Sequence, residues 1–192
     1  NMDSNINLGE IECKILNGRK VNIKANIDID VNIYSNENVE FIKDVENDNG
    51  VQVLNTSAVM DSLLGTGMTK AYAKDTITID NNDNLSEIMK VNLNMTNKET
   101  KTSYNKILVK SDMQVNIMYL TDDNRVNEVK WQIPVMGFID MQGISDDNLC
   151  DVNYEIKNCL VKPNNVDEHS IYIEVELEIS CNVFEKKELN II

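Results

Sequence analysis

Residues 21–33 read Val-Asn-Ile-Lys-Ala-Asn-Ile-Asp-Ile-Asp-Val-Asn-Ile, so every odd position is apolar and every even position is polar. Successive side chains of a β-strand point to opposite faces, and a period of two therefore predicts a strand with one buried face. At about 3.3 Å per residue this strand is roughly 43 Å long. Strict alternation of this kind is typical of antiparallel sheets.

The same alternation recurs twice along the chain. Residues 171–183 repeat it with seven apolar positions on one face, and residues 107–119 repeat it less regularly because Ser111 interrupts the apolar side. Shorter β-like segments precede the three copies at residues 12–17, 92–97 and 153–158, and others follow them at residues 39–45, 126–133 and 189–192. A threefold repeat of strand, long strand and strand indicates a structural module rather than an enzyme.

The pattern predicts an all-β fold of repeated long antiparallel β-hairpins, in a sandwich-like or open two-sheet architecture, because an apolar strand face must be covered by another sheet. Gly65-Thr66-Gly67 interrupts the alternation and is interpreted as a turn or β-bulge between two strands. Asn84 and Glu87 have the spacing of a capping box, which predicts one short helix at residues 84–89. We expect two domains, the end of a preceding β unit at 1–59 and a complete β unit at 60–192, with one continuous domain as the alternative.

The charge balance limits the classes of partner. The chain has 18 basic and 32 acidic residues, a formal net charge of -14, which works against nucleic acid and anionic membranes and leaves basic partners open. No stretch approaches the roughly 20 apolar residues of a membrane span, and the first residues have no basic or apolar leader, so we expect a soluble chain that is not exported. The four cysteines have no C-x-x-C spacing, which favours free thiols over a disulfide framework.

No pattern indicates a catalytic, cofactor or metal site. Acidic pairs and clusters at 80–83, 122–123 and 146–147 lack the central Gly and terminal Glu of a calcium loop. Residues 65–70 lack the spacing of a phosphate loop. His169 is the only histidine, and no nucleophile signature accompanies it. We therefore expect a protein that is not an enzyme and binds no cofactor.

Two sets of residues are candidates for an interaction surface. Tyr172, Glu174, Glu176 and Glu178 form an acidic stripe on the polar side of the last long strand, which predicts either docking of a basic partner or a solvated face that discourages edge pairing. Trp131 and Phe138 belong to the densest apolar stretch outside the long strands. Core packing is the first interpretation of that stretch, and a hydrophobic contact surface is the alternative.

A resemblance to a known family rests on an ordered set of motifs. Glu87-Ile88 precedes a strand at Val91, Lys106–Val109 leads to Ile117–Leu120, Ile133-Pro134 is followed by Phe138-Ile139-Asp140, and Tyr154-Glu155-Ile156 precedes the alternating strand at Ile171. In this order the motifs resemble the SPOCS domain over residues 71–192, and residues 8–48 look like the end of a preceding unit.

The resemblance implies a sporulation protein of Firmicutes, chiefly clostridia, in which SPOCS repeats usually precede a C-terminal LysM module. The resemblance to the characterised coat protein SipL implies a location in the mother-cell cytoplasm at the forespore surface. It also implies other coat proteins and the morphogenetic ATPase SpoIVA as partners, and a role in coat assembly. This sequence shows no LysM pattern, so the ATPase contact attributed to that module is not carried over to it, and we expect a fragment of a longer protein.

Three functions follow as hypotheses. The first is a structural and protein-interaction module of spore-coat assembly that contacts other coat proteins or itself. The second is a module that binds cell-wall glycan or another carbohydrate, which would need exposed aromatic side chains beside a groove. The third is a hydrolase with paired carboxylates in its acidic loops, for which no pair can be named.

Overall fold

The structure is a computed structural model that describes residues 2–35, 37–38, 40–42, 44–46, 50, 52–80, 82–164, 166–167 and 169–192. All regular elements among these residues are β-strands, which confirms the predicted all-β class. The chain divides into two compact units, which are described separately. Unit 1 comprises residues 1–54 and 191–192, and unit 2 comprises residues 55–190.

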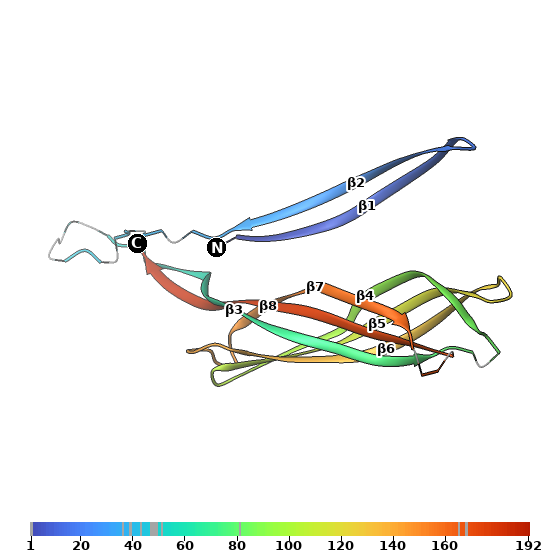
Figure 1. The fold of residues 1–192 in the computed structure, drawn as a ribbon. Helices are drawn as coiled ribbons and strands as arrows, with labels where there is room; N and C mark the ends of the chain where they lie inside the picture. The colour runs from blue at the N-terminus through green and yellow to red at the C-terminus, as the bar shows by residue number, and fades with distance from the viewer. Residues whose placement is uncertain are drawn as a thin grey trace. The chain divides into compact units, whose positions relative to one another are not determined.

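Unit 1 contains one long antiparallel hairpin of β1 (Met2–Asn17) and β2 (Lys20–Ile33) (Figure 1). The strand predicted from residues 21–33 is therefore confirmed, but the burial predicted for its apolar face is wrong, because the apolar side chains are exposed. Directly opposite residues share a face of the sheet, and five consecutive apolar pairs meet on one side of this hairpin. We call this side the hairpin face; its pairs are Ile6 with Ile29, Leu8 with Ile27, Ile11 with Ala25, Cys13 with Ile23, and Ile15 with Val21.

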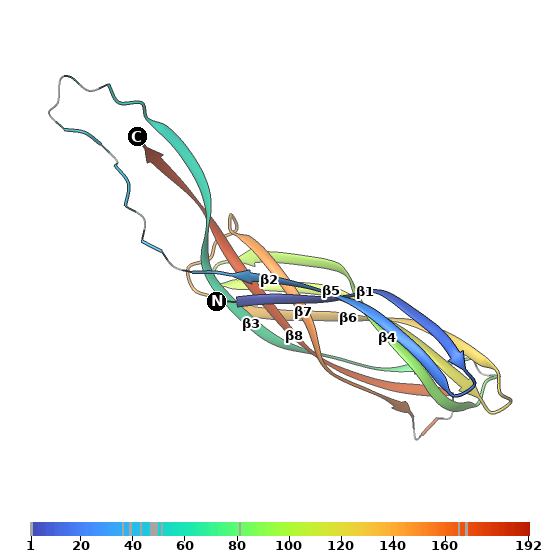
Figure 2. The same cartoon turned by 90° about the horizontal axis from the view of Figure 1, so that it is seen from above.

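Unit 2 is a two-sheet sandwich (Figures 1 and 2). One sheet has the order β4-β5-β6, formed by Leu85–Ser103, Lys106–Thr121 and Val126–Asp140. The other has the order β3-β8-β7, formed by Thr56–Thr78, Ser170–Ile191 and Leu149–Pro163. The central strands β5 and β8 are the two other long alternating segments that the sequence predicts.

The core of unit 2 is built from the odd positions of β5 and β8. The side chains of β5 at Ile107, Val109, Met113 and Ile117 are fully buried. The apolar odd positions of β8 from Ile171 to Ile179 are fully buried as well. Smaller contributions come from β3 and β6. The period of two therefore buries one face of each central strand, as the sandwich architecture requires.

Ser111 interrupts the apolar side of β5 without leaving a polar group unpaired. Its side chain is buried, and its hydroxyl donates to the carbonyl of Thr96 in β4 at 2.7 Å. The pairing of β4 with β5 shifts between Thr96 and Glu99, and Asn97 has a φ of 50°. The hydrogen bond removes most of the cost of burying a hydroxyl beside this bulge.

The helix predicted at residues 84–89 is wrong, because Leu85–Ser103 is strand β4. Two register shifts lie near the start of β4, one between Leu85 and Glu87 and the other between Ile88 and Lys90. Each β-bulge adds one residue to the strand, so apolar Leu85, Ile88 and Val91 are spaced by three and imitate a helical pattern. The side chain of Asn84, the expected helix cap, instead donates to Asp122 at 2.9 Å.

Gly65-Thr66-Gly67, predicted as a turn or β-bulge between two strands, does not separate two strands, because these residues lie inside β3. A Cβ atom on Gly67 would lie 2.5 Å from Cγ2 of Ile139 in β6, and one on Gly137 would lie 3.0 Å from Cγ2 of Thr69. These glycines therefore let the edge strands of the two sheets approach each other closely.

Two of the short strands expected after the long ones do not form as predicted. In the segment 39–45 the described residues have no regular structure, and Val39 and Lys43 lie outside the described residues. Leu189 is the other case, since it continues β8 rather than starting a new strand. The segment predicted at 126–133 does form, as the first part of β6.

Candidate functional site

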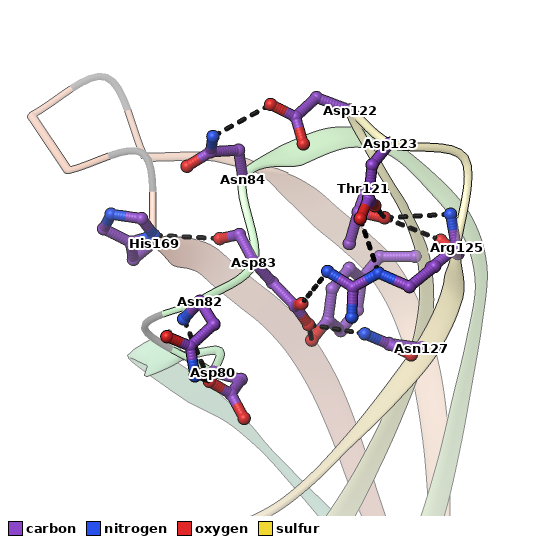
Figure 3. Close-up of polar contacts among 11 residues, drawn as sticks. Asp80, Asn82, Asp83, Asn84, Thr121, Asp122, Asp123, Arg125, Asn127 and His169 are labelled. Carbon is purple, nitrogen blue, oxygen red and sulfur yellow. Dashed lines mark hydrogen bonds and ion pairs between the residues drawn. The ribbon is translucent and has the colours of Figure 1, made fainter.

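A buried carboxylate gathers polar side chains at one end of unit 2 (Figure 3). Asp83 is only 2% exposed. Its Oδ2 accepts hydrogen bonds from the Tyr119 hydroxyl at 2.8 Å and from Nδ2 of Asn127 at 2.6 Å. Its Oδ1 lies 3.1 Å from Nη2 of Arg125. Asp83, Tyr119, Arg125, Asn127 and His169 are called the Asp83 cluster below.

Three connections between strands supply three members of this cluster, and strands β5 and β6 supply Tyr119 and Asn127. Asp83 follows β3, Arg125 belongs to the turn between β5 and β6, and His169 immediately precedes β8. Nδ1 of His169 lies 2.9 Å from the main-chain carbonyl of Asp83, and the carbonyl of His169 accepts from the amide of Ile79 at 2.9 Å. The cluster therefore ties loops of both sheets together at one end of the sandwich.

The turn between β5 and β6 holds Arg125 in place. Thr121 Oγ1 accepts from the Arg125 amide at 3.0 Å, and Nε of Arg125 lies 2.6 Å from Oδ2 of Asp123. The guanidinium thus bridges the exposed Asp123 and the buried Asp83, as the dashed contacts in Figure 3 show. A forked cation suits this position because it can satisfy two carboxylates at once.

The environment lowers the pKa of the Asp83 carboxyl and raises the pKa of the Tyr119 hydroxyl. Hydrogen bonds from Tyr119 and Asn127, and then the charge of Arg125, hold the pKa of Asp83 below its usual range. Burial, together with the hydrogen bond to Asp83, raises the pKa of Tyr119 to about 12. At neutral pH the pair is therefore a fixed carboxylate and a neutral phenol.

This arrangement is suited to clamping loops rather than to acid–base catalysis. A general base works best with a pKa near the operating pH, whereas the pKa of Asp83 is lowered. The imidazole of His169 contacts a main-chain carbonyl, not the carboxylate. Among the described residues no buried side-chain nitrogen or oxygen lacks a hydrogen-bond partner, so the cluster offers no unpaired group to a ligand.

The acidic stripe of Tyr172, Glu174, Glu176 and Glu178 lies on the outer face of the central strand β8, where all four side chains are partly buried. Lysines of both neighbouring strands pair with it: Lys74 with Glu174 at 2.8 Å, Lys70 with Glu176 at 2.8 Å, and Lys157 with Glu178 at 3.1 Å. The tyrosine hydroxyl donates to Glu174 at 2.8 Å, and the ammonium of Lys162 lies 5.5 Å from its ring centroid.

These pairs remove the negative charge that made the stripe attractive to a basic partner. Hydrogen bonds and charge within the pairs raise the pKa of Lys70 and Lys74 and lower that of Glu174 and Glu176. Each of the three glutamates already has a cation, so a basic partner would have to displace three lysines. Docking at the stripe stays a prediction, and the geometry favours a ladder of ion pairs that links the three strands of the sheet.

Trp131 and Phe138 lie on different sides of β6 and do not form one patch. Nε1 of Trp131 donates to Oδ2 of Asp75 in β3 at 2.8 Å, which joins the facing edges of the two sheets. The Trp131 side chain also lines a groove with Gln114 and Gln132. Phe138 lies opposite Leu108 of β5, on the outer face of the sheet β4-β5-β6, and is 54% exposed.

Ile133, Val135 and Ile139 in the same stretch are buried. The odd positions of β6 from Ile133 onward therefore pack in the core, whereas the side chain of Phe138 is exposed. A contact surface at Phe138 stays a prediction.

The described residues show no candidate metal site, no disulfide and no membrane-spanning helix. No group of three or more His, Cys, Asp and Glu side chains in that part of the chain could hold a metal ion. All four cysteines are free thiols, and burial raises the pKa of Cys181 to about 12. Where residues are described, none forms a helix with the length and hydropathy of a membrane span.

The sequence showed residues 80–83 only as an acidic cluster without a calcium-loop pattern, so the Asp83 cluster was missed. Its members come from positions 83, 119, 125, 127 and 169, so no local spacing joins them. One signal was available: the apolar face of β5 ends in a tyrosine, whose hydroxyl needs a partner when it is buried. The partner itself could not be read from the sequence.

Comparison with known proteins gives a family for the central part of the chain. Residues 84–164 match the family model described as the SPOCS domain of SipL. This range holds the sheet β4-β5-β6 and strand β7, whereas β3 and β8, which complete the second sheet, lie outside it. Searches of the curated proteins and of the solved structures find no match.

The SPOCS family consists of non-catalytic structural domains and is associated with sporulation. The ordered motifs and the two-sheet fold agree with this match, which supports a SPOCS domain in this part of the chain.

Proposed function

We propose that this chain is a non-enzymatic structural and protein-interaction module of spore-coat assembly. It acts in the mother cell at the forespore surface, where it presents rigid sheet surfaces to other coat proteins. The observation that carries the proposal is the match of residues 84–164 to the SPOCS domain. The morphogenetic ATPase SpoIVA is the partner expected to recruit the whole assembly, through a LysM module in proteins that have one.

The geometry supports a scaffold in two ways. The central strands β5 and β8 bury long continuous faces against each other, which makes the sandwich a rigid body. The Asp83 cluster then ties the connections at one end, so the loops there are held in a fixed arrangement. Rigid sheets with ordered ends are suited to repeated contacts in an assembly.

The geometry gives less support to a glycan-binding module. Such a site would need exposed aromatic rings that share a groove. Tyr72 is 57% exposed on the outer side of β3, whereas Phe138 is on the outer side of the opposite sheet and Trp131 is at the edge between the sheets. These rings do not converge on one surface. Trp131 is the one aromatic residue among those that line the groove beside it.

The test is the location of a fluorescent fusion of this chain in sporulating cells of its own host. We expect fluorescence on the mother-cell side of the forespore surface, and co-purification of coat proteins from the same cells. As a folding control, Leu177→Asp should abolish the location, because Leu177 is fully buried in β8. Diffuse fluorescence throughout the mother cell, with no coat protein retained, would contradict the proposal.

A further inference from the structure

Two of the four cysteines are neighbours on the core side of the sheet β3-β8-β7. Cys150 of β7 pairs with Val183 of β8, and Cys181 of β8 pairs with Val152 of β7. Cys150 and Cys181 are therefore diagonal neighbours on one face of the sheet. Each thiol forms a side-chain hydrogen bond with the other. No local spacing in the sequence joins the two positions, and the pairing of the strands alone brings them together.

The two thiols differ in their access to solvent. Cys181 is 1% exposed and belongs to the hydrophobic core, whereas Cys150 is partly buried and packs against that core. Cys150 is also the second residue of β7, directly after the connection from β6. A small oxidant in solution therefore meets the thiol of Cys150, whereas Cys181 reacts only with its neighbour.

The contact between the thiols also gives them different acidities. Burial raises the pKa of the Cys150 thiol, and the hydrogen bond from Cys181 opposes this shift. For Cys181 the contact with Cys150 adds to the effect of burial, and its pKa rises to about 12. The thiolate is the reactive form of cysteine, so Cys150 is the member of the pair that reacts first. Because its pKa is still raised, the pair stays reduced until an oxidant is abundant.

The place of Cys150 in the sheet allows the two sulfur atoms to reach bonding distance. Diagonal neighbours in a regular antiparallel pair have α-carbons about 7–8 Å apart, and most disulfides span about 4.4–6.8 Å. A bond therefore needs a backbone shift of roughly 1 Å. Strand β7 can make this shift because it is an edge strand of its sheet and Cys150 is next to its end. A disulfide closed under such strain is easily reduced again, so the link is reversible.

We propose that Cys150 and Cys181 are a redox pair that forms a reversible disulfide when hydrogen peroxide is abundant. Peroxide oxidises the sulfur of Cys150 to a sulfenic acid and releases one water. The sulfur of Cys181 then attacks the sulfur of Cys150, the S–S bond forms, and the sulfenic oxygen leaves as a second water with the proton of Cys181. Two electrons pass from the thiol pair to the peroxide. The inference does not rest on the proposed role in coat assembly.

The disulfide fastens the start of an edge strand to the centre of its sheet. Within the sheet, β7 has only β8 as a neighbour, and most of its residues are exposed or partly buried. The ends of such strands open locally at a low cost in free energy. A covalent bond at the second residue of β7 prevents this opening, so oxidation makes one end of the sandwich more rigid.

The test uses the full chain with Cys13→Ser and Cys159→Ser, which removes the two exposed thiols and keeps the pair. After treatment with hydrogen peroxide we expect the loss of both remaining thiols and a fall of about 2 Da in the mass of the intact monomer. Dithiothreitol should restore both thiols. In the same background, Cys181→Ala removes the resolving thiol, so the mass should instead rise by about 16 or 32 Da as Cys150 gains oxygen. Cys150→Ser should leave the buried Cys181 thiol unreacted.

Peptide mapping of the parent chain gives a second readout that needs no substitution. The oxidised parent should yield one pair of peptides joined through Cys150 and Cys181. The proposal is overturned if the pair keeps its two thiols at every peroxide concentration, or if its mass rises by added oxygen and does not fall. It is also overturned if the joined peptides contain Cys13 or Cys159, or if Cys181 reacts equally fast in Cys150→Ser.

Hydrogen exchange tests the consequence for the strand. The amides at the start of β7 should exchange several-fold more slowly in the oxidised chain than in the reduced chain, because this end no longer opens. The amides of β4, an edge strand of the other sheet, are the internal control and should exchange alike in both forms. Unchanged exchange at the start of β7 in a chain that carries the disulfide would overturn the fastening of this strand.

Discussion

Strands β2 and β8 carry the same alternating pattern but have opposite burial. Position by position, residues 21–33 correspond to residues 171–183, with isoleucine at Ile23 and Ile173 and again at Ile29 and Ile179. Ile173 and Ile179 are 0% exposed, whereas Ile23 is 65% and Ile29 is 61% exposed. The two strands therefore differ in what covers them and not in their own sequence pattern.

The comparison shows how far a local pattern determines a structure. Alternation sets which side chains share a face, because that follows from the geometry of one strand. Burial of that face needs a second sheet, and in unit 2 the strands of β4-β5-β6 supply it. The two-stranded sheet of unit 1 has the alternating pattern of a sandwich half, but its apolar side chains are exposed.

Isoleucine truncation at matched positions should separate the two strands most clearly. Ile179→Ala should lower the free energy of unfolding of unit 2 by about 3–5 kcal/mol, because it leaves a cavity in a closed core. Ile29→Ala should leave that unfolding within about 0.5 kcal/mol of the parent, since it changes an exposed side chain. The measurement is urea unfolding followed by the fluorescence of Trp131, which lies in unit 2. Equal losses in the two variants would contradict the comparison.

Much of the fold could be predicted because apolar and polar residues alternate along the long strands. The central strands β5 and β8 and the strand β2 follow from a period of two at Ile107, Ile171 and Val21. The error at residues 84–89 has a physical cause, since two β-bulges give β4 an apolar spacing of three. Bulges depend on the partner strand, and one strand's sequence does not show them.

The candidate surface could be predicted only in part. The polar side of β8 was identified, but its charge was misjudged because Lys70, Lys74 and Lys157 come from strands far away in the sequence. The Asp83 cluster was missed for the same reason. Pairing partners that meet through the topology need the sheet order, which local spacing does not contain.

A second difference between the units is the close approach of two sheets, which exists in the sandwich and depends on Gly67. Gly67→Ala would place a Cβ atom 2.5 Å from Ile139, so overpacking should cost about 1–3 kcal/mol of the stability of unit 2. Gly65→Ala, two residues away in β3, is the matched control because its Cβ meets Met141 at an ordinary 3.5 Å. The same unfolding assay measures both, and a Gly65 variant as unstable as the Gly67 variant would show that the effect comes from the strand and not from the contact.

The third difference is the buried polar cluster at the end of the sandwich. Tyr119→Phe removes a hydrogen bond to a buried carboxylate and should cost about 1–2 kcal/mol at pH 7. Tyr104→Phe is the control, because Tyr104 is 84% exposed. A loss in the control as large as in the Tyr119 variant would remove the cluster from the explanation.

The pH dependence of the cluster has opposite signs at its two central groups. The pKa of Tyr119 is raised from 10.0 to about 12, so its neutral form stabilises the fold fully below pH 10, and this contribution is lost as the pH rises toward about 12. The pKa of Asp83 is lowered from 3.8, so its contribution is complete above that value and is lost as the pH falls through the folded-state pKa. Phenolate absorbance should show a late ionisation near pH 12 that is missing in Tyr119→Phe.

The acid limb has its own matched pair of variants. Asp83→Asn should flatten the fall in stability below about pH 4, because the group that gains a proton is gone. Asp80→Asn should leave that fall in place, since Asp80 is exposed and contacts only its neighbour Asn82 among the side chains drawn in Figure 3. Denaturant midpoints measured between pH 3 and pH 7 decide between the two, and an unchanged acid limb in Asp83→Asn would contradict the lowered pKa.

The smallest expected effect is at the acidic stripe, where the solvent screens each ion pair. Lys70 is largely exposed, so Lys70→Ala should barely move the denaturant midpoint of unit 2, and added salt should reduce even that change. Its consequence should instead be electrostatic, because it frees the charge of Glu176 on the outer face of β8. Binding of a short oligolysine peptide should then increase in Lys70→Ala relative to the parent, whereas Lys130→Ala, which leaves the stripe unchanged, should bind like the parent. If the parent chain already binds the peptide as strongly as the Lys70 variant does, the lysines do not neutralise the stripe, and β8 would carry two functional faces: one that closes the core and one that recruits basic partners.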